Sequence, residues 1–180
     1  MLEDERKLIE LSKEGEADAF GLLYDHYFAK IYRFILVRVG RREEAEDLSH
    51  QTFLKAWQNL KNYSDKGLPF GSWLYRIARN AIIDYYRRSR TSVSLDFHFE
   101  IPENSRMEEK MDASLELEQT IEAIGELKPA EQEVIILRFM EELSVAETAK
   151  ITGKSEGAVK VTQHRAVKKL KELLRQWKKS

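Results

Sequence analysis

The sequence predicts an all-α fold made of two small helical domains. Apolar residues recur every three or four positions through most of the 180-residue chain, which is the period of an amphipathic helix. Gly153 and the turn-rich stretch 62–71 separate some of these periodic segments. A stretch rich in serine and acidic residues interrupts the pattern near the middle of the chain. We therefore expect one domain over residues 1–92, a flexible acidic linker over 93–110 and a second domain over 111–180.

The composition excludes several classes of protein. The chain contains no cysteine, so it has neither disulfides nor thiolate ligands for a metal. Its four histidines are scattered, and no two of them have the spacing of a zinc site. Residues 1–16 are too highly charged for a signal peptide, and no run approaches the roughly 18 apolar residues of a membrane span. We therefore expect a soluble, cytoplasmic protein that requires no metal or cofactor and does not insert into a membrane.

The usual sequence signatures of catalysis are also missing. The eight glycines are dispersed, so they form no phosphate-binding loop, and there is neither a nucleophile elbow nor an HExxH motif. Adjacent glutamates occur at 43–44, 108–109 and 141–142, on segments predicted to be solvent-exposed helices. Such pairs are ordinary features of a soluble surface. The sequence therefore predicts that the protein is not an enzyme.

Amphipathic helices are predicted to build the first domain. We expect them over residues 4–14, 16–27, 30–39, 42–59 and 70–88, with a loop over 62–71. The helix 42–59 has a clear apolar stripe, which consists of Ala45, Leu48, Thr52, Phe53, Ala56 and Leu60. Trp57 lies at the edge of this stripe. The pattern leaves two roles open for Trp57, and it favours a core side chain over a contact with a partner.

The predicted helix 70–88 combines basic and aromatic residues. Residues 70–92 hold five arginines against a single acid, Asp84, and the aromatic residues among them are Trp73, Tyr75, Tyr85 and Tyr86. Arginine binds phosphate, and an aromatic ring can stack on an unpaired base for about 1–3 kcal/mol, which suits single-stranded nucleic acid. Taken alone, the segment fits an ordinary surface helix equally well, with Phe70, Leu74, Ile77, Ala81 and Tyr85 facing the core.

The second domain is predicted to end in a helix-turn-helix over residues 143–174. Helices over 107–125 and from Pro129 onward precede it. Its first helix stops at Gly153, because glycine adopts the left-handed conformation of a helix end. Ser155 can cap the second helix, whose outer face is polar and basic. Such a pair fits the DNA major groove, although similar pairs also occur in helical proteins that do not bind DNA.

Charge is distributed unevenly along the chain, although the net charge is only −1. Residues 153–180 contain nine lysines and arginines against two acids, whereas residues 93–126 contain ten acids against two bases. Two basic segments, 70–92 and 153–180, therefore flank an acidic one. Clustered positive charge releases counterions from DNA and supplies affinity that does not depend on sequence. One nucleic-acid ligand that contacts both basic segments explains this order.

Three motifs resemble those of bacterial sigma factors of the extracytoplasmic-function (ECF) group, which belong to the sigma-70 family. Residues 45–57, AEDLSHQTFLKAW, resemble the region 2 helix that docks on the clamp helices of RNA polymerase. Residues 69–88, PFGSWLYRIARNAIIDYYRR, resemble the segment that melts and reads the promoter −10 element. Residues 127–174 resemble region 4, which binds the −35 element. Together the motifs cover nearly the whole chain in the family's order.

The resemblance implies a protein without catalytic activity that binds core RNA polymerase and directs it to promoter DNA. The residues implied to face the polymerase clamp helices are Asp47, Leu48, Gln51, Leu54 and Trp57. Those implied to contact the melted, single-stranded −10 element are Tyr63, Arg76, Arg79, Asn80, Tyr85, Arg87 and Arg88, with the loop 63–68 capturing a flipped base. Those implied to contact duplex −35 DNA are Ser155, Lys160, Val161, His164, Arg165, Lys168 and Lys169.

Two positions depart from the family's pattern. His50 and Gln51 stand where relatives often have Gln and Glu, which bears on the detail of the polymerase contact. Gln163 stands where relatives usually have an apolar core residue. Either the second helix of the helix-turn-helix is slightly rotated, or Gln163 reaches DNA.

The resemblance adds an anti-sigma factor to the expected partners, because relatives are commonly held inactive by such a protein. The competing hypothesis is a stand-alone helix-turn-helix transcription regulator, with residues 1–92 as an effector or dimerisation domain. Binding of the free chain to DNA separates the two. A regulator binds duplex sites alone, whereas a sigma factor requires the polymerase.

Overall fold

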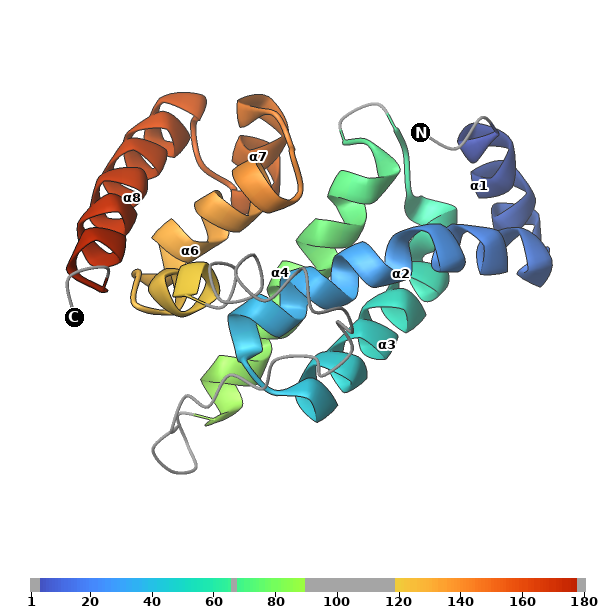
Figure 1. Ribbon diagram of the computed structural model, residues 1–180. Helices are drawn as coiled ribbons and strands as arrows, with labels where there is room; N and C mark the ends of the chain where they lie inside the picture. The colour runs from blue at the N-terminus through green and yellow to red at the C-terminus, as the bar shows by residue number, and fades with distance from the viewer. Residues whose placement is uncertain (1–3, 66–67, 90–118, 178–180) are drawn as a thin grey trace, which may run out of the picture. The chain divides into compact units, whose positions relative to one another are not determined.

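The computed structural model describes residues 4–65, 68–89 and 119–177, which fall into two compact units (Figure 1). The first unit contains the helices α1 to α4, and the second contains α6 to α8. Every regular element within these described ranges is a helix, so the predicted all-α fold with two helical domains is confirmed. The predicted linker 93–110 lies outside the described residues, as does most of the helix predicted over 107–125.

The first unit begins with a short helix packed against a long one. α1 (Glu5–Glu14) ends at Gly15, whose φ of 105° lies in the left-handed region. α2 (Ala17–Val39) then runs without a break. The prediction of separate helices over 16–27 and 30–39 was therefore wrong. The two residues between those segments are neither glycine nor proline, so nothing interrupts the backbone hydrogen bonds of one continuous helix.

The apolar faces predicted for the next two helices are largely confirmed. All six residues predicted to form the stripe of α3 (Arg42–Asn59) and the adjoining η1 (Leu60–Asn62) are buried. In α4 (Phe70–Ser89), Phe70, Leu74 and Ala81 are buried, whereas Ile77 and Tyr85 are half-buried. Tyr75 also belongs to the core, since it is 3% exposed and its ring lies edge-on to that of Phe34, with centroids 5.3 Å apart.

A close approach joins α2 to the first turn of α4. The ring of Tyr27 packs on Phe70, with ring centroids 5.6 Å apart, and it lies directly against Gly71. A Cβ atom added at Gly71 would be 2.8 Å from Cε1 of Tyr27, which is closer than van der Waals contact allows. Glycine at this position therefore lets α2 and α4 pack at this point.

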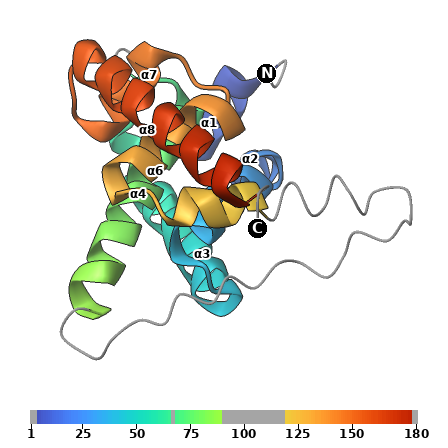
Figure 2. The ribbon, with the colours of Figure 1, turned by 60° about the vertical axis from the view of Figure 1, so that its left-hand side comes forward.

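In the second unit, the long helix α8 packs against a group of shorter helices. A helical segment over 119–125 precedes α6 (Pro129–Ile135), the π-helical turn η3 (Ile136–Met140), α7 (Val145–Thr152) and α8 (Glu156–Trp177). Pro129 occupies the first turn of α6 as predicted, where its missing N–H costs nothing. α8 packs against both α6 and α7 (Figure 2) through a core of Val134, Ala149 and Val159.

The substitution Gly71→Ala is expected to destabilise the first unit, because the new methyl group displaces the ring of Tyr27. Overpacking of this kind costs about 1–3 kcal/mol. Alanine recovers about 1 kcal/mol over glycine inside a helix. We expect a net loss of about 1 kcal/mol in the free energy of unfolding, measured by urea titration.

Gly21→Ala is the matched control for this substitution. Gly21 lies within α2, and nothing lies within 4 Å of a Cβ atom added there. The same change should therefore stabilise the protein by about 0.5–1 kcal/mol through helix propensity alone. Equal effects at the two glycines would contradict the close packing of Tyr27 on Gly71.

Candidate nucleic-acid and protein interfaces

Side-chain caps set the geometry of the helix-turn-helix formed by α7 and α8. Ser144 caps α7, since its hydroxyl accepts a hydrogen bond from the backbone N–H of Glu147 at 3.1 Å, and the Glu147 carboxylate accepts one from the N–H of Ser144 at 2.9 Å. Gly153 ends α7 with a φ of 69°, as predicted. The Ser155 hydroxyl accepts from the N–H of Ala158 at 3.2 Å and so caps α8, as predicted.

The face of α8 that points away from the core carries the predicted −35 contacts. Val159 and Ala166 are fully buried, which fixes the rotation of the helix on its support. The exposed members of the predicted set are Ser155, Lys160, Val161, His164, Arg165 and Lys168. Lys169 differs from them, because it is half-buried and its ammonium group donates to the backbone carbonyl of Glu126 at 2.7 Å. Six of the seven predicted residues are therefore accessible on one helix.

Gln163 faces its own unit rather than the exposed surface of α8. Its side-chain oxygen accepts a hydrogen bond from Nε of Arg138 at 3.0 Å, and both side chains are half-buried. Arg138 also donates to the carbonyl of Leu143. That carbonyl follows Glu142, which has a positive φ of 55°. Gln163 thus makes a half-buried polar contact within its own unit, which the sequence did not predict.

α4 presents a basic face in the first unit. Of the predicted −10 contacts on this helix, Arg76, Asn80, Arg87 and Arg88 are exposed, whereas Arg79 and Tyr85 are half-buried. Arg87 pairs with Asp84 one turn earlier, at 3.2 Å. Ile83 is 42% exposed on the same helix and adds an apolar group near these cations. The helix therefore offers charge for phosphates together with apolar surface.

Tyr63 is the one residue of the predicted −10 set that is buried. It is only 7% exposed, and its ring packs against Trp73 and Phe70, with centroids 4.8 Å and 5.5 Å away. Its hydroxyl donates to the carbonyl of Leu68 at 3.0 Å. Burial, with smaller contributions from Asp65 and Glu5, raises the pKa of Tyr63 to about 12. The phenol therefore stays protonated near neutral pH and remains a donor.

A cavity of about 490 Å³ opens beside Tyr63, between the end of α3 and α4. It is lined by Lys55, Asn59, Asn62, Tyr63, Trp73, Ile77, Asn80 and Asp84. Side-chain amides can pair with the edges of a nucleobase, and a tryptophan ring can stack on its face. Asn59, Asn62 and Trp73 were not predicted as site residues. The available signal was the pair of asparagines three positions apart at the end of a helix, next to the predicted loop.

The predicted polymerase contacts on α3 divide between surface and core. Asp47 and Gln51 are exposed, Leu54 is 56% exposed, and Leu48 is buried. Trp57 is half-buried, with its ring 4.8 Å from that of Phe20, so it packs against α2 and leaves part of its surface exposed.

A second cavity, of about 300 Å³, brings part of this set together with α4. It is lined by Asp47, Leu48 and Gln51 from α3 and by Tyr85 and Arg88 from α4. Two groups of residues that the sequence assigned to different partners thus meet in the first unit.

His50 and Gln51, the two positions that depart from the family's pattern on α3, are both exposed. The His50 ring lies on the aromatic side of α2, with its centroid 5.4 Å from that of Phe28. Its Nδ1 is 3.4 Å from the hydroxyl of Tyr24, and its Nε2 is 3.9 Å from the carboxylate of Glu46. His50 therefore contacts α2 from an exposed position.

Neither a metal site nor a membrane span was found where the structure is described. Among those residues, no three His, Asp or Glu side chains are grouped closely enough to hold a metal ion. None of the helices there is long and apolar enough to cross a bilayer.

Comparisons with known proteins match both units. A family profile for Sigma-70 region 2 matches residues 23–91, and a profile for Sigma-70, region 4 matches residues 117–170. The ECF RNA polymerase sigma factor SigW of Bacillus subtilis is 33% identical over 181 residues, which cover 94% of this chain and 96% of SigW.

Two further similar proteins differ in how much of their own length this chain covers. The ECF sigma factor BldN of Streptomyces coelicolor is 44% identical over 177 residues, covering 93% of this chain, but this chain spans only 65% of the length of BldN. Among solved structures, CnrH in complex with the cytosolic domain of CnrY is similar with a TM-score of 0.75 and 27% identity, over 97% of this chain and 99% of CnrH. Since both regions match in order and SigW matches over almost its full length, the chain belongs to the ECF sigma factors of the sigma-70 family.

Proposed function

We propose that this sigma factor binds core RNA polymerase and reads promoters with both of its units. α8 reads the −35 element as duplex DNA, and α4 with the preceding loop melts and reads the −10 element. The observation that carries the proposal is the outer face of α8, on which Lys160, Val161, His164 and Arg165 are all exposed on a capped helix. A helix of this kind fits the major groove, where every base pair presents a distinct pattern.

The residues of α8 divide by the part of the −35 element that they contact. Lys160, Val161, His164 and Arg165 face the base edges, and a bidentate contact from Arg165 to guanine would discriminate by about 1–3 kcal/mol. Ser155, Lys168 and Lys169 contact phosphates and set the register. Ser155 can do both tasks, because its oxygen caps α8 while its O–H is left to donate.

The cavity beside Tyr63 is proposed to hold a base flipped out of the −10 element. Extruding a base costs a few kcal/mol. Stacking on Trp73 and hydrogen bonds from Asn59, Asn62 and Asn80 can offset that cost, and all four residues line the cavity. Arg76, Arg79, Arg87 and Arg88 hold the backbone of the strand, Tyr85 packs beside it, and Tyr63 forms the wall of the cavity.

The polymerase surface is proposed to lie on α3. Asp47, Gln51 and Leu54 are exposed there, and Leu48 and Trp57 support them from below. We assign region 2 to residues 1–92 and region 4 to residues 111–180, joined by the linker 93–110. The role is one of binding rather than catalysis. It requires the cytoplasm, where the polymerase works.

An anti-sigma protein is the proposed regulator of this binding. CnrH was solved in complex with the cytosolic domain of CnrY, and CnrH is similar to this chain over 97% of its length. A regulator that covers α3 would prevent the polymerase contact directly.

The first test is transcription from fragmented genomic DNA of the source organism by its core RNA polymerase, with and without this protein. Discrete transcripts that require the protein are expected, and their upstream sequences would give both promoter elements. Failure to bind core polymerase, together with duplex binding by the free chain, would instead identify a stand-alone regulator.

Arg165→Ala is expected to lower transcription from the mapped promoters about tenfold, because one base contact is lost. Binding to core polymerase, measured by fluorescence anisotropy, should not change, since Arg165 belongs to α8 of the second unit and the proposed polymerase surface belongs to α3 of the first. An equal loss of polymerase binding would show that Arg165 has another role.

Gln163→Leu is expected to destabilise the second unit by about 1–2 kcal/mol, because Nε of Arg138 loses its acceptor in a half-buried site. Gln163→Glu retains an oxygen acceptor and should preserve the thermal stability. If the leucine variant unfolds at the wild-type temperature or above it, the bond to Arg138 contributes nothing to the support of α8.

A further inference from the structure

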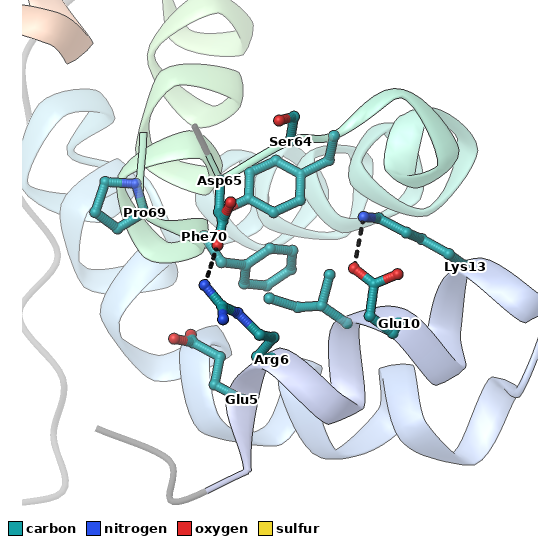
Figure 3. A pocket seen from close by; sticks show the side chains of 10 residues that line it. Glu5, Arg6, Glu10, Lys13, Ser64, Asp65, Pro69 and Phe70 are labelled. Atoms are coloured by element: carbon teal, nitrogen blue, oxygen red, sulfur yellow. Dashed lines mark hydrogen bonds and ion pairs between the residues drawn. The ribbon is translucent and has the colours of Figure 1, made fainter. Parts of the chain in front are cut away.

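α1 forms one wall of a cavity whose other wall is the loop that precedes α4 (Figure 3). This cavity, of about 640 Å³, lies between Glu5, Arg6 and Lys13 of α1 and Tyr63 and Asp65 of the loop. We call it the α1 cavity, and we call the cavity of about 490 Å³ beside Trp73 and Asn80 the base cavity. Tyr63 lines both cavities, so the two cavities share this residue.

Two contacts connect α1 directly to the loop. Arg6 reaches across the α1 cavity to Asp65, with Nη2 and Oδ2 2.9 Å apart (Figure 3). The ammonium group of Lys13 lies 5.7 Å from the centroid of the Tyr63 ring, within the range of a cation–π contact. Glu10 holds Lys13 in place through an ion pair of 2.9 Å. One helix therefore contacts both the Asp65 carboxylate in the loop and the Tyr63 ring that lines both cavities.

A third connection runs from α1 through α2 to the start of α4. The hydroxyl of Tyr27 donates a hydrogen bond to the carboxylate of Glu5. The pKa of Tyr27 is raised mainly by burial and, to a smaller extent, by this hydrogen bond. The Tyr27 ring packs on Phe70, which in turn packs on Tyr63 at a centroid distance of 5.5 Å. Two of the three connections, through Lys13 and through Tyr27, thus end at the Tyr63 ring, and the third ends at Asp65.

The charges of the α1 cavity argue against a site for DNA. Three acids line it, Glu5, Glu10 and Asp65, against the two cations Arg6 and Lys13. Both cations are already paired with acids. A phosphate would therefore meet a surface with excess negative charge, so we interpret these contacts as a brace on the loop.

We propose that α1 is a positioning element for −10 recognition, which holds Tyr63 and the loop so that the base cavity keeps its shape. The inference rests on the proposed function of the base cavity. Arg6, Glu5 and Lys13 do not contact the base. They act through Tyr63, whose hydroxyl also fixes the loop by its bond to the carbonyl of Leu68 at 3.0 Å.

The test measures base preference rather than overall affinity. Holoenzyme is titrated with single-stranded oligonucleotides that carry the −10 element of a promoter mapped as above, either intact or substituted at the flipped base. Arg6→Asp and Asp65→Arg should each lower the ratio of the two affinities about two- to fivefold, the range of an exposed ion pair. The double variant, with the charges exchanged, should return to within about twofold of the wild type. Tyr27→Phe, which removes the bond to Glu5 without a charge change, should lower the ratio in the same direction.

Glu14→Arg is the matched control, because it makes a charge change of the same size on an exposed residue of α1 that does not line the α1 cavity. It changes the electrostatic potential at both oligonucleotides equally, so the ratio of the two affinities should remain at the wild-type value. Unchanged ratios in the single variants, or a double variant as weak as they are, would overturn the positioning role. Variants that lose binding to core polymerase to the same extent would also overturn the positioning role. A wild-type holoenzyme that shows no preference at any −10 base would instead refute the proposed function itself.

Discussion

The packing of Tyr27 on Gly71 and Phe70 is the contact on which the first unit depends. It fixes the point at which α4 starts, and it does so with a side chain from the middle of α2. Everything proposed for −10 recognition follows from that starting point. The direction of α4 sets where Asn80 and the arginines lie. Phe70, in the first turn of α4, packs against the ring of Tyr63. A larger residue at 71 would shift the whole arrangement.

In the second unit, small side chains and one polar contact hold α8 in place. Val159 and Ala166 let α8 approach its support closely, and both are fully buried. The bond between Arg138 and Gln163 then joins the recognition helix to η3 and, through Leu143, to the turn before α7. The exposed face of α8 is consequently held by contacts on its opposite side. DNA can meet a helix whose rotation is already fixed.

Much of this was readable from the sequence because it depends on local spacing. The stripe of α3, the stop at Gly153 and the cap at Ser155 follow from residues within one or two turns of each other, and the structure confirms them. The family resemblance rests on such motifs as well.

The features that the sequence did not reveal depend on contacts between distant residues. Gln163 meets Arg138 from 25 positions away, and Glu5 meets Tyr27 from 22 positions away. No periodicity encodes such a pairing, so Gln163 was expected to rotate α8 or to reach DNA. The burial of Tyr63 was not visible in the sequence for the same reason, since it depends on Phe70 and Trp73, which follow the loop. The base cavity could not be outlined until η1 and α4 were placed together.

Lys55 and Asp84 each line both the base cavity and the cavity of about 300 Å³ between α3 and α4. A ligand that moves either side chain in one cavity changes the shape of the other. If the polymerase and a flipped base bind as proposed above, thermodynamic linkage requires each to alter the affinity of the other by the same factor. On that proposal, the two shared side chains couple the assembly of the holoenzyme to the opening of a promoter.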